Sequence, residues 1–138
     1  MIKTLVIDDN EELLQCYQEA LQNDGHDLFL FNNPLQALSL LNSEKFDLIV
    51  TDLRMPGISG QDLLLTIRKN PLNLHCPIVV VSDYMSELKF SLTNTLQIGR
   101  IHFVAKPFAV TTLKAEIDLA LESGHRRNQR KTGINEID

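Results

Sequence analysis

The sequence has few cysteines and no hydrophobic run long enough to cross a membrane. Its two cysteines, Cys16 and Cys76, are far apart and match no CxxC or zinc-ligand spacing, so we expect neither a disulfide framework nor a structural zinc site. The longest apolar runs, such as 48–50 and 77–81, fall far short of the ~20 residues of a transmembrane helix. Residues 1–3 lead directly into a strand pattern rather than a signal peptide. We therefore expect a soluble protein of the cytoplasm that does not associate with a membrane.

An excess of basic charge and a glycine-rich phosphate loop are also missing. There are 18 Asp plus Glu against 13 Lys plus Arg, a formal net charge of −5. Because binding to a nucleic-acid backbone depends on clustered Lys and Arg, we expect no nucleic-acid binding by the body of the domain. Gly57 and Gly60 form neither a dinucleotide fingerprint nor a P-loop, since no lysine follows at the required position. The glycines therefore give no support to a nucleotide site.

Size and composition predict a single compact domain. The chain has 138 residues, of which 43% are hydrophobic and 22% are charged. This is enough to bury a core without metals or cross-links, and it leaves no room for a second large domain. We assign residues 1–122 to this domain. After Ser123 and Gly124 the composition becomes polar and partly basic, so we expect residues 123–138 to form a tail or linker.

Hydrophobic periodicity switches repeatedly between short continuous runs and helical spacing. Helical spacing predicts five helices, the first starting at Asn10, the second capped by Asn33, and the fourth carrying an apolar stripe from Met85 to Leu96. Each helix follows a strand, and the strand runs are apolar enough to be covered on both faces. This pattern implies a three-layer, doubly wound α/β domain with a five-stranded parallel sheet. The five strands are expected at residues 4–7, 27–31, 46–51, 78–81 and 101–104.

Polar side chains stand at the carboxyl ends of four of the five expected strands. In doubly wound sheets, ligands bind beyond these ends, at the point where the strand order reverses. We therefore expect these side chains to converge on one crevice. They are Asp8, Asp9, Asp52, Ser82 and Lys106.

The chemistry of this set suits a metal ion and a phosphoryl group. Three carboxylates in one crevice repel one another unless a cation lies among them. Mg²⁺ prefers oxygen ligands and is held by one or two carboxylates together with phosphate oxygens, which suits Asp8, Asp9 and Asp52. The ammonium of Lys106 and the hydroxyl of Ser82 would orient the phosphoryl group. Asp52 would then act as the nucleophile and form an acyl phosphate.

Each of these residues taken singly has a plainer interpretation. The pair Asp8 and Asp9 before a helix can serve only as a cap and as a complement to the helix dipole. Asp52, ahead of Pro56 and Gly57, can be a turn residue. What favours the functional interpretation is that four strand ends each supply one part of the same site.

The sequence resembles the receiver domain of two-component response regulators, the CheY-like family, over about residues 2–122. The resemblance implies a CheY-like, flavodoxin-like fold with sheet order 2-1-3-4-5. It also implies that Asp52 accepts a phosphoryl group from a sensor histidine kinase or a histidine phosphotransfer protein. The motifs that carry the resemblance are LVIDDN at 5–10, LIVTDLRMPG at 48–57, VVS at 80–82 and KPF at 106–108.

Ligands for Mg²⁺ follow from the same resemblance. Asp9 and Asp52 would bind the ion directly, and Asp8 would bind it directly or through water. The backbone carbonyl of Arg54 would be a further ligand. The resemblance also implies a cis peptide bond between Lys106 and Pro107, an isomer that proline permits.

The resemblance further implies a two-state switch and an output surface. The hydroxyl of Ser82 would move to bond a phosphoryl oxygen, and Phe103 would swing inward behind it. Because Phe103 has no hydroxyl, its movement would depend on packing alone, and a plain core aromatic is the other interpretation. The output surface would consist of the fourth helix, the fifth strand and the fifth helix. It would bind a downstream effector or a second copy of the domain.

Asp83 departs from the family pattern, in which the residue after the switch hydroxyl is usually small. Its carboxylate adds bulk and negative charge where a phosphoryl group must arrive. We hypothesise that Asp83 slows phosphorylation, and that it shields the acyl phosphate from water or pairs with Lys106. The alternative is that Asp83 points outward to solvent.

Three functions remain open from the sequence. The first is a phosphoryl-accepting signalling switch, which is not an enzyme beyond promoting its own phosphorylation and dephosphorylation. The second is a receiver-like interaction module that does not use phosphate. Asp83 is the residue that keeps this alternative open. The third is a Mg²⁺-dependent phosphohydrolase. It is disfavoured because Asp52 is not followed, two residues on, by the second carboxylate that such enzymes use as acid and base.

Overall fold

The computed structural model describes the backbone of residues 1–83 and 100–132, and the side chains up to residue 122. A five-stranded parallel sheet forms its centre, in the order β2-β1-β3-β6-β7. Counted along these five strands alone, this is the predicted order 2-1-3-4-5, so the predicted sheet is confirmed. The strands are Ile2–Ile7 (β1), His26–Phe31 (β2), Leu48–Thr51 (β3), Ile78–Ser82 (β6) and Ile101–Ala105 (β7).

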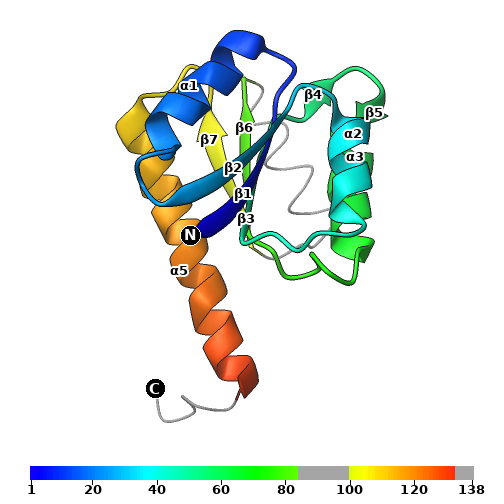
Figure 1. Cartoon of the computed structure of the whole chain (residues 1–138), viewed down its shortest axis with the longest axis vertical. Helices are drawn as coiled ribbons and strands as arrows, with labels where there is room; N and C mark the ends of the chain where they lie inside the picture. Colours follow the sequence, from blue (N-terminus) through cyan, green and yellow to red (C-terminus); the bar gives the residue numbers. More distant parts are fainter. Residues whose placement is uncertain (84–99, 133–138) are drawn as a thin grey trace.

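Helices cover both faces of the sheet, which confirms the doubly wound, three-layer arrangement (Figure 1). One face carries α1 (Glu11–Leu21) and α5 (Val110–Thr132), and the other carries α2 (Pro34–Leu41) and α3 (Gly60–Lys69). The predicted fourth helix falls in residues 84–99, outside the described residues. Among the described residues, none of the helices combines the length and apolarity that a membrane crossing needs.

The strands bury side chains on both faces, as their continuous apolar runs predict. Along β1, Val6 packs on the side of α1 and α5, whereas Leu5 and Ile7 pack on the side of α2 and α3. Along β6, Val79 and Val80 alternate in the same way. Full burial of such a side chain contributes about 1.5–3 kcal/mol. The ends of the strands are therefore fixed by a core on each side.

Asparagine side chains start the first two helices at the predicted positions. The Oδ1 atom of Asn10 accepts the N–H of Leu13 at 3.1 Å, and that of Asn33 accepts the N–H of Leu35 at 2.8 Å. Pro34 occupies the first position of α2. Each bond satisfies an N–H group that has no partner within its helix. Because α1 starts so soon after β1, the acidic residues between them stay at the carboxyl end of the sheet.

A small hairpin follows the third strand, where the sequence suggested only a turn. Its strands, β4 (Arg54–Met55) and β5 (Ile58–Ser59), pair antiparallel. Gly57 between them has a φ of +100°, which side chains rarely tolerate. Gly60 follows, and a Cβ atom there would collide with Leu53. The two glycines thus allow the hairpin to fold back closely against the end of β3.

The last helix extends past the predicted domain boundary at residue 122. α5 continues without a break to Thr132 and reaches beyond the body of the domain (Figure 1). Arg, Gln and Lys have good helix propensity, so the polar composition of this segment does not end the helix. A tail or linker role for residues 123–138 is still a prediction.

Candidate functional site

Three carboxylates meet at the carboxyl ends of β1 and β3, which are neighbouring strands. Asp8 follows β1, and Asp52 follows β3. Ligand oxygens of Asp8, Asp9 and Asp52 lie within 4.8 Å of one another. Asp8 and Asp52 are buried, whereas Asp9 is exposed. The structure therefore brings the three predicted ligands into one cluster with an opening to solvent.

Lys106 balances part of this charge from the end of β7. Its Nζ atom donates to Oδ2 of Asp52 at 2.8 Å and to Oδ2 of Asp8 at 3.0 Å. Burial opposes the charge on the ammonium, but the bonds to Asp52 and Asp8 outweigh it and raise the pKa of Lys106. Lys106 is therefore protonated at neutral pH. Its single positive charge faces two buried carboxylates.

Asp8 lies in an unfavourable environment for a negative charge. Burial raises the pKa of Asp8, and repulsion from Asp52 adds to the rise. The N–H of Asn10, 3.0 Å from Oδ1, and the ammonium of Lys106 partly offset it. The hydroxyl of Tyr17 donates to Oδ2 at 3.4 Å, and burial together with the nearby carboxylates raises the pKa of Tyr17. A cation beside Asp8 would favour the ionised carboxylate.

The backbone of its own loop holds Asp52 in place. Its Oδ1 atom accepts the N–H of Leu53 at 2.6 Å and the N–H of Arg54 at 3.1 Å. Its carbonyl accepts the hydroxyl of Thr51 at 2.7 Å. The two bonds to Oδ1 fix the orientation of the carboxylate. The other oxygen, Oδ2, accepts the ammonium of Lys106.

A hollow of about 610 Å³ lies next to Asp52. The β4–β5 hairpin and Asp83 line it together with Asp52. Asp83 is exposed and is one of the residues that line this hollow, which leaves both interpretations of its carboxylate open. Arg54 also lines the hollow. The role of its carbonyl as a metal ligand is still a prediction.

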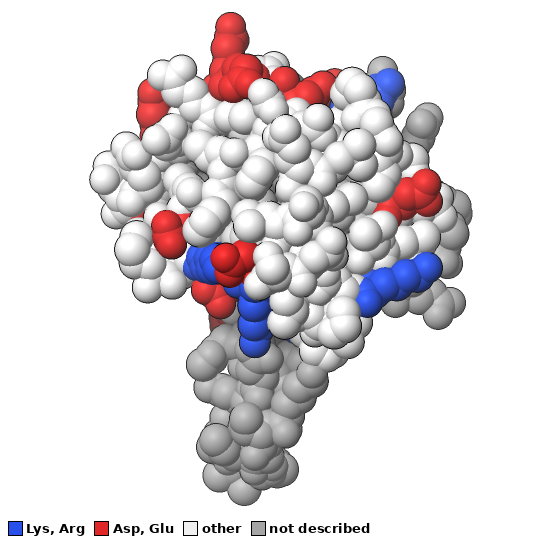
Figure 2. All heavy atoms as spheres, turned by 45° about the vertical axis from the view of Figure 1, so that its right-hand side comes forward, with Lys and Arg blue, Asp and Glu red and all other residues white. Residues whose placement is uncertain are grey.

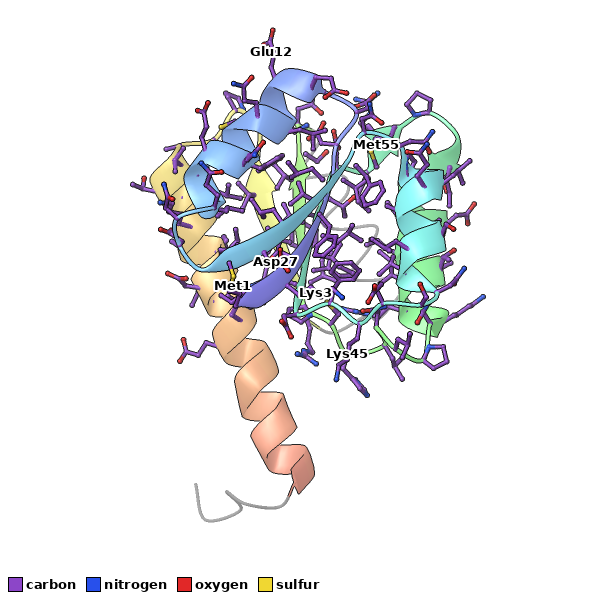
Figure 3. The ribbon with its side chains drawn as sticks, viewed as in Figure 1. Met1, Lys3, Glu12, Asp27, Lys45 and Met55 are labelled. Carbon is purple, nitrogen blue, oxygen red and sulfur yellow. The ribbon has the colours of Figure 1, made fainter. Side chains whose placement is uncertain are left out.

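This end of the molecule is rich in acidic groups. Asp and Glu side chains gather at the upper end in Figure 2, the end at which the strands of Figure 1 finish. Figure 3 shows Glu12 and Met55 at this end, and Lys3 and Lys45 at the opposite end of the sheet. A negative field of this kind attracts cations.

Ser82 and Lys106 stand at the carboxyl ends of adjacent strands. Ser82 is the last residue of β6 and is fully buried. Its carbonyl accepts the N–H of Lys106 at 2.9 Å. Phe103 lies within β7, half-buried, and packs against the core on the side of α2 and α3. The structure thus places Ser82 at the end of the sheet that carries the carboxylates, and leaves both interpretations of Phe103 open. The peptide bond between Lys106 and Pro107 is cis, as predicted.

Comparison with known protein families shows what kind of domain carries this site. The response regulator receiver domain family matches residues 4–118. The chain belongs to this family. The receiver domain is 31% identical over 127 residues to the chemotaxis protein CheY-3 of Vibrio cholerae, covering 88% of this chain and 92% of CheY-3.

A second relative shows that such a domain also occurs within a longer protein. The receiver domain is 31% identical over 132 residues to the 3',5'-cyclic-nucleotide phosphodiesterase regA of Dictyostelium discoideum. The match covers 94% of this chain but only 16% of that phosphodiesterase. Among solved structures, the signal receiver domain of an HD domain-containing protein from Pseudomonas fluorescens Pf-5 has a TM-score of 0.81 at 25% identity, covering 94% of this chain and 93% of that one.

Tyr17 is a residue near the receiver site that sequence reasoning did not single out. Its ring lies in the core on the side of α1 and α5. Its hydroxyl nevertheless contacts Asp8. The available signal was the residue type, because a buried tyrosine hydroxyl usually needs a hydrogen-bond partner.

Proposed function

We propose that this receiver domain is a signalling switch controlled by Mg²⁺-dependent phosphorylation of Asp52. The observation that carries the proposal is that Lys106 bonds to both Asp8 and Asp52 inside a cluster of three carboxylates. A capping role for the aspartates does not account for this arrangement, because Asn10 caps α1. A role in a turn does not account for the bond between Asp52 and the ammonium of Lys106.

The donor set fits Mg²⁺. Two buried carboxylates and one exposed carboxylate converge, and Lys106 supplies one compensating charge. Mg²⁺ prefers oxygen ligands and retains several waters, which the exposed position of Asp9 allows. The ion would be held by Asp8, Asp9, Asp52 and the backbone carbonyl of Arg54. When bound, it would neutralise charge on the carboxylates and on the phosphoryl oxygens.

A carboxylate oxygen of Asp52 would attack the phosphorus atom of a phosphohistidine. The P–N bond breaks as the O–P bond forms, and the leaving imidazole keeps the electron pair and takes up a proton. The ammonium of Lys106 would then bond one phosphoryl oxygen, and the hydroxyl of Ser82 another. Attack by water on phosphorus would later release inorganic phosphate and restore the Asp52 carboxylate. On this proposal the domain promotes its own phosphorylation and dephosphorylation and is not an enzyme for other substrates.

The proposed partners follow from membership of the receiver family. Receiver domains in general interact with histidine kinases and downstream effectors. For this chain we assign phosphoryl donation to a sensor histidine kinase or a histidine phosphotransfer protein of the cytoplasm. The readout would be a reshaped surface of residues 84–99, β7 and α5, with Phe103 moving inward, and it would bind an effector or a second copy of the domain. Residues 84–99 lie outside the described part of the chain.

Asp83 would control access of the phosphodonor. It lines the same hollow as Asp52, so its charge would act on a donor that enters the hollow. Negative charge at this position repels a phosphodonor and slows phosphorylation. The position of Asp83 also supports the second candidate function, an interaction module that keeps the fold and its partner surface without using phosphate.

The proposal is tested by the intact mass of the protein after incubation with Mg²⁺ and acetyl phosphate. A phosphoryl adduct that forms in the parent protein, and neither in Asp52→Asn nor with EDTA, supports the switch. An adduct that forms only in Asp83→Ala supports a gated or phosphate-independent module. The same adduct in Asp52→Asn would overturn the assignment of the acceptor.

A further inference from the structure

The hydroxyl of Tyr17 stands in an unusual place for a core side chain. Tyr17 is 1% exposed and lies on the buried face of α1. A phenylalanine would keep the ring without a polar group, whereas a phenol brings a hydroxyl that must be hydrogen-bonded when buried. Its partner is the carboxylate of Asp8 rather than a backbone carbonyl of the core. A polar contact between the core and a candidate metal ligand therefore needs a functional explanation.

Both oxygens of Asp8 have hydrogen-bond donors. Oδ1 accepts the N–H of Asn10 at 3.0 Å. Oδ2 accepts two donors, the ammonium of Lys106 at 3.0 Å and the hydroxyl of Tyr17 at 3.4 Å. The Tyr17 distance is long for an O–H···O bond, and the stronger, charged donor occupies the same oxygen. Tyr17 is thus the second donor at Oδ2 as long as Lys106 stays there.

The ring of Tyr17 also touches the loop that carries Lys106. It stacks on Phe108, with ring centroids 5.8 Å apart and an interplanar angle of 16°. Phe108 comes two residues after Lys106 in the chain. One side chain of α1 therefore contacts both the carboxylate of Asp8 and the loop after β7.

We infer, building on the proposed function, that Tyr17 is a positioning residue that holds the Asp8 carboxylate for Mg²⁺ when the Lys106 ammonium turns to the phosphoryl group. In that state Lys106 no longer bonds Oδ2 of Asp8. The Tyr17 hydroxyl, fixed by the stacking of its ring on Phe108, remains as a neutral donor to the same oxygen. It keeps the buried carboxylate oriented without adding a positive charge that would compete with the metal ion.

The test compares Mg²⁺ binding by the whole chain and its variants without a phosphodonor. Because an ion that binds only the folded state raises the midpoint of thermal unfolding, the dissociation constant, which is the half-saturating Mg²⁺ concentration, can be fitted from the rise of that midpoint with Mg²⁺ concentration. Tyr17→Phe removes the hydroxyl and keeps the ring. We expect it to raise the half-saturating concentration about three- to tenfold, as for the loss of an ordinary hydrogen bond, because in the parent the hydroxyl is the second donor at Oδ2 beside Lys106.

A matched control separates positioning from stability. Leu21 lies on the same buried face of α1 and is also 1% exposed. Leu21→Val should lower the midpoint without Mg²⁺ and leave the half-saturating concentration unchanged. An equal rise of that concentration in Leu21→Val and Tyr17→Phe would overturn the inference.

A second measurement uses the shared oxygen of Asp8. In Lys106→Ala, Tyr17 would be the remaining side-chain donor at Oδ2 among those that the described structure places there. Tyr17→Phe should therefore weaken Mg²⁺ binding by a larger factor in this background than in the parent chain, which is a double-mutant cycle. If Tyr17→Phe leaves the half-saturating Mg²⁺ concentration unchanged both in the parent chain and in Lys106→Ala, the inference is overturned. Mg²⁺ binding by the parent without an adduct on Asp52 would overturn the proposed function alone, and no binding at all would overturn both.

Discussion

The Nζ atom of Lys106 lies 2.8 Å from Oδ2 of Asp52, although the two residues are 54 positions apart in the chain. The contact is shielded, because the side chains of Lys106 and Asp52 are only 16% and 8% exposed. It joins the ends of β3 and β7, which are separated in the sheet by β6. The ion pair therefore depends on the correct order of β3, β6 and β7 in the sheet.

Removal of the Lys106 ammonium should destabilise the protein and make it depend on Mg²⁺. Lys106→Met leaves the carboxylates of Asp8 and Asp52 buried without their cation, which costs about 3–5 kcal/mol of unfolding free energy. Added Mg²⁺ should recover more stability in this variant than in the parent. Urea denaturation with and without Mg²⁺ measures both effects.

Lys114 supplies the matched control for this experiment. Its Nζ pairs with Oδ2 of Asp24 at 3.1 Å, but the two side chains are 38% and 46% exposed. An exposed pair contributes about 0–1 kcal/mol. Lys114→Met should therefore change stability little and should not alter the response to Mg²⁺. Equal losses in the two variants would contradict the special role of Lys106.

Replacement of Asp83 should speed phosphorylation of Asp52. Asp83→Ala removes a negative charge from the hollow that Asp52 shares. At a separation of a few ångströms near the surface, one charge changes the free energy of approach of an anion by about 1–4 kcal/mol, so a rise in the labelling rate of about fivefold to a thousandfold is expected. The initial rate of adduct formation from acetyl phosphate, followed by intact mass, measures it.

Asp27→Ala is the control for net charge. Asp27 is an exposed aspartate of β2, away from the hollow, and is labelled in Figure 3. Its removal changes the net charge by the same amount and should leave the labelling rate unchanged. A similar acceleration in both variants would mean that overall charge, and not the position of Asp83, limits phosphorylation.

The strand ends of this site could be predicted because their signals are local. Continuous apolar runs fix where β1 and β3 end, and Asp8 and Asp52 follow those runs directly. A general property of parallel sheets then places their carboxyl ends at one edge. The cap at Asn10 was predictable for the same reason, since it depends on a bond to Leu13 only three residues away.

Other features of the site depend on tertiary packing and could not be predicted in this way. The bond from Tyr17 to Asp8 depends on the exact rotation of α1 about its axis. Helical spacing predicts which face of α1 is buried, but it does not predict this rotation closely enough to place one hydroxyl. The hollow shared by Asp52 and Asp83 requires the β4–β5 hairpin, which follows β3, to lie near the residue that follows β6. The extension of α5 to Thr132 depends on helix propensity beyond the amphipathic part, where the apolar pattern no longer indicates a helix.

His26 should make the stability of the fold sensitive to mild acid. Its ring is buried, and Nδ1 shares a hydrogen bond of 2.8 Å with the hydroxyl of Thr4. Burial lowers the pKa of His26, and the nearby Asp24 and Asp118 offset this only in part. The folded state thus favours the neutral ring. Its contribution to stability is fully present above the unfolded pKa of about 6.5 and is lost as the pH falls through the lower folded value.

The measurement for His26 is the free energy of unfolding between about pH 8 and pH 5, the range that spans the titration of a histidine. The parent should lose stability over this range more steeply than His26→Gln, which cannot take up the proton. Thr4→Val tests the hydrogen bond, because it should lower stability at the upper end of the range. Parallel curves for the parent and His26→Gln would contradict the prediction.

Only one of the two cysteines should react with a thiol reagent in the folded protein. Burial raises the pKa of Cys76 to about 12, with the charges of Arg68 and Arg100 offsetting it only in part, and the residue is 6% exposed. Since the thiolate is the reactive form, Cys76 should stay unmodified at about pH 8, where an ordinary thiol reacts. The half-exposed Cys16 should react with one equivalent of iodoacetamide, and the second equivalent should react only in denaturant. Cys16→Ser should then be inert when folded, and modification of that variant under native conditions would show that the core around Cys76 opens.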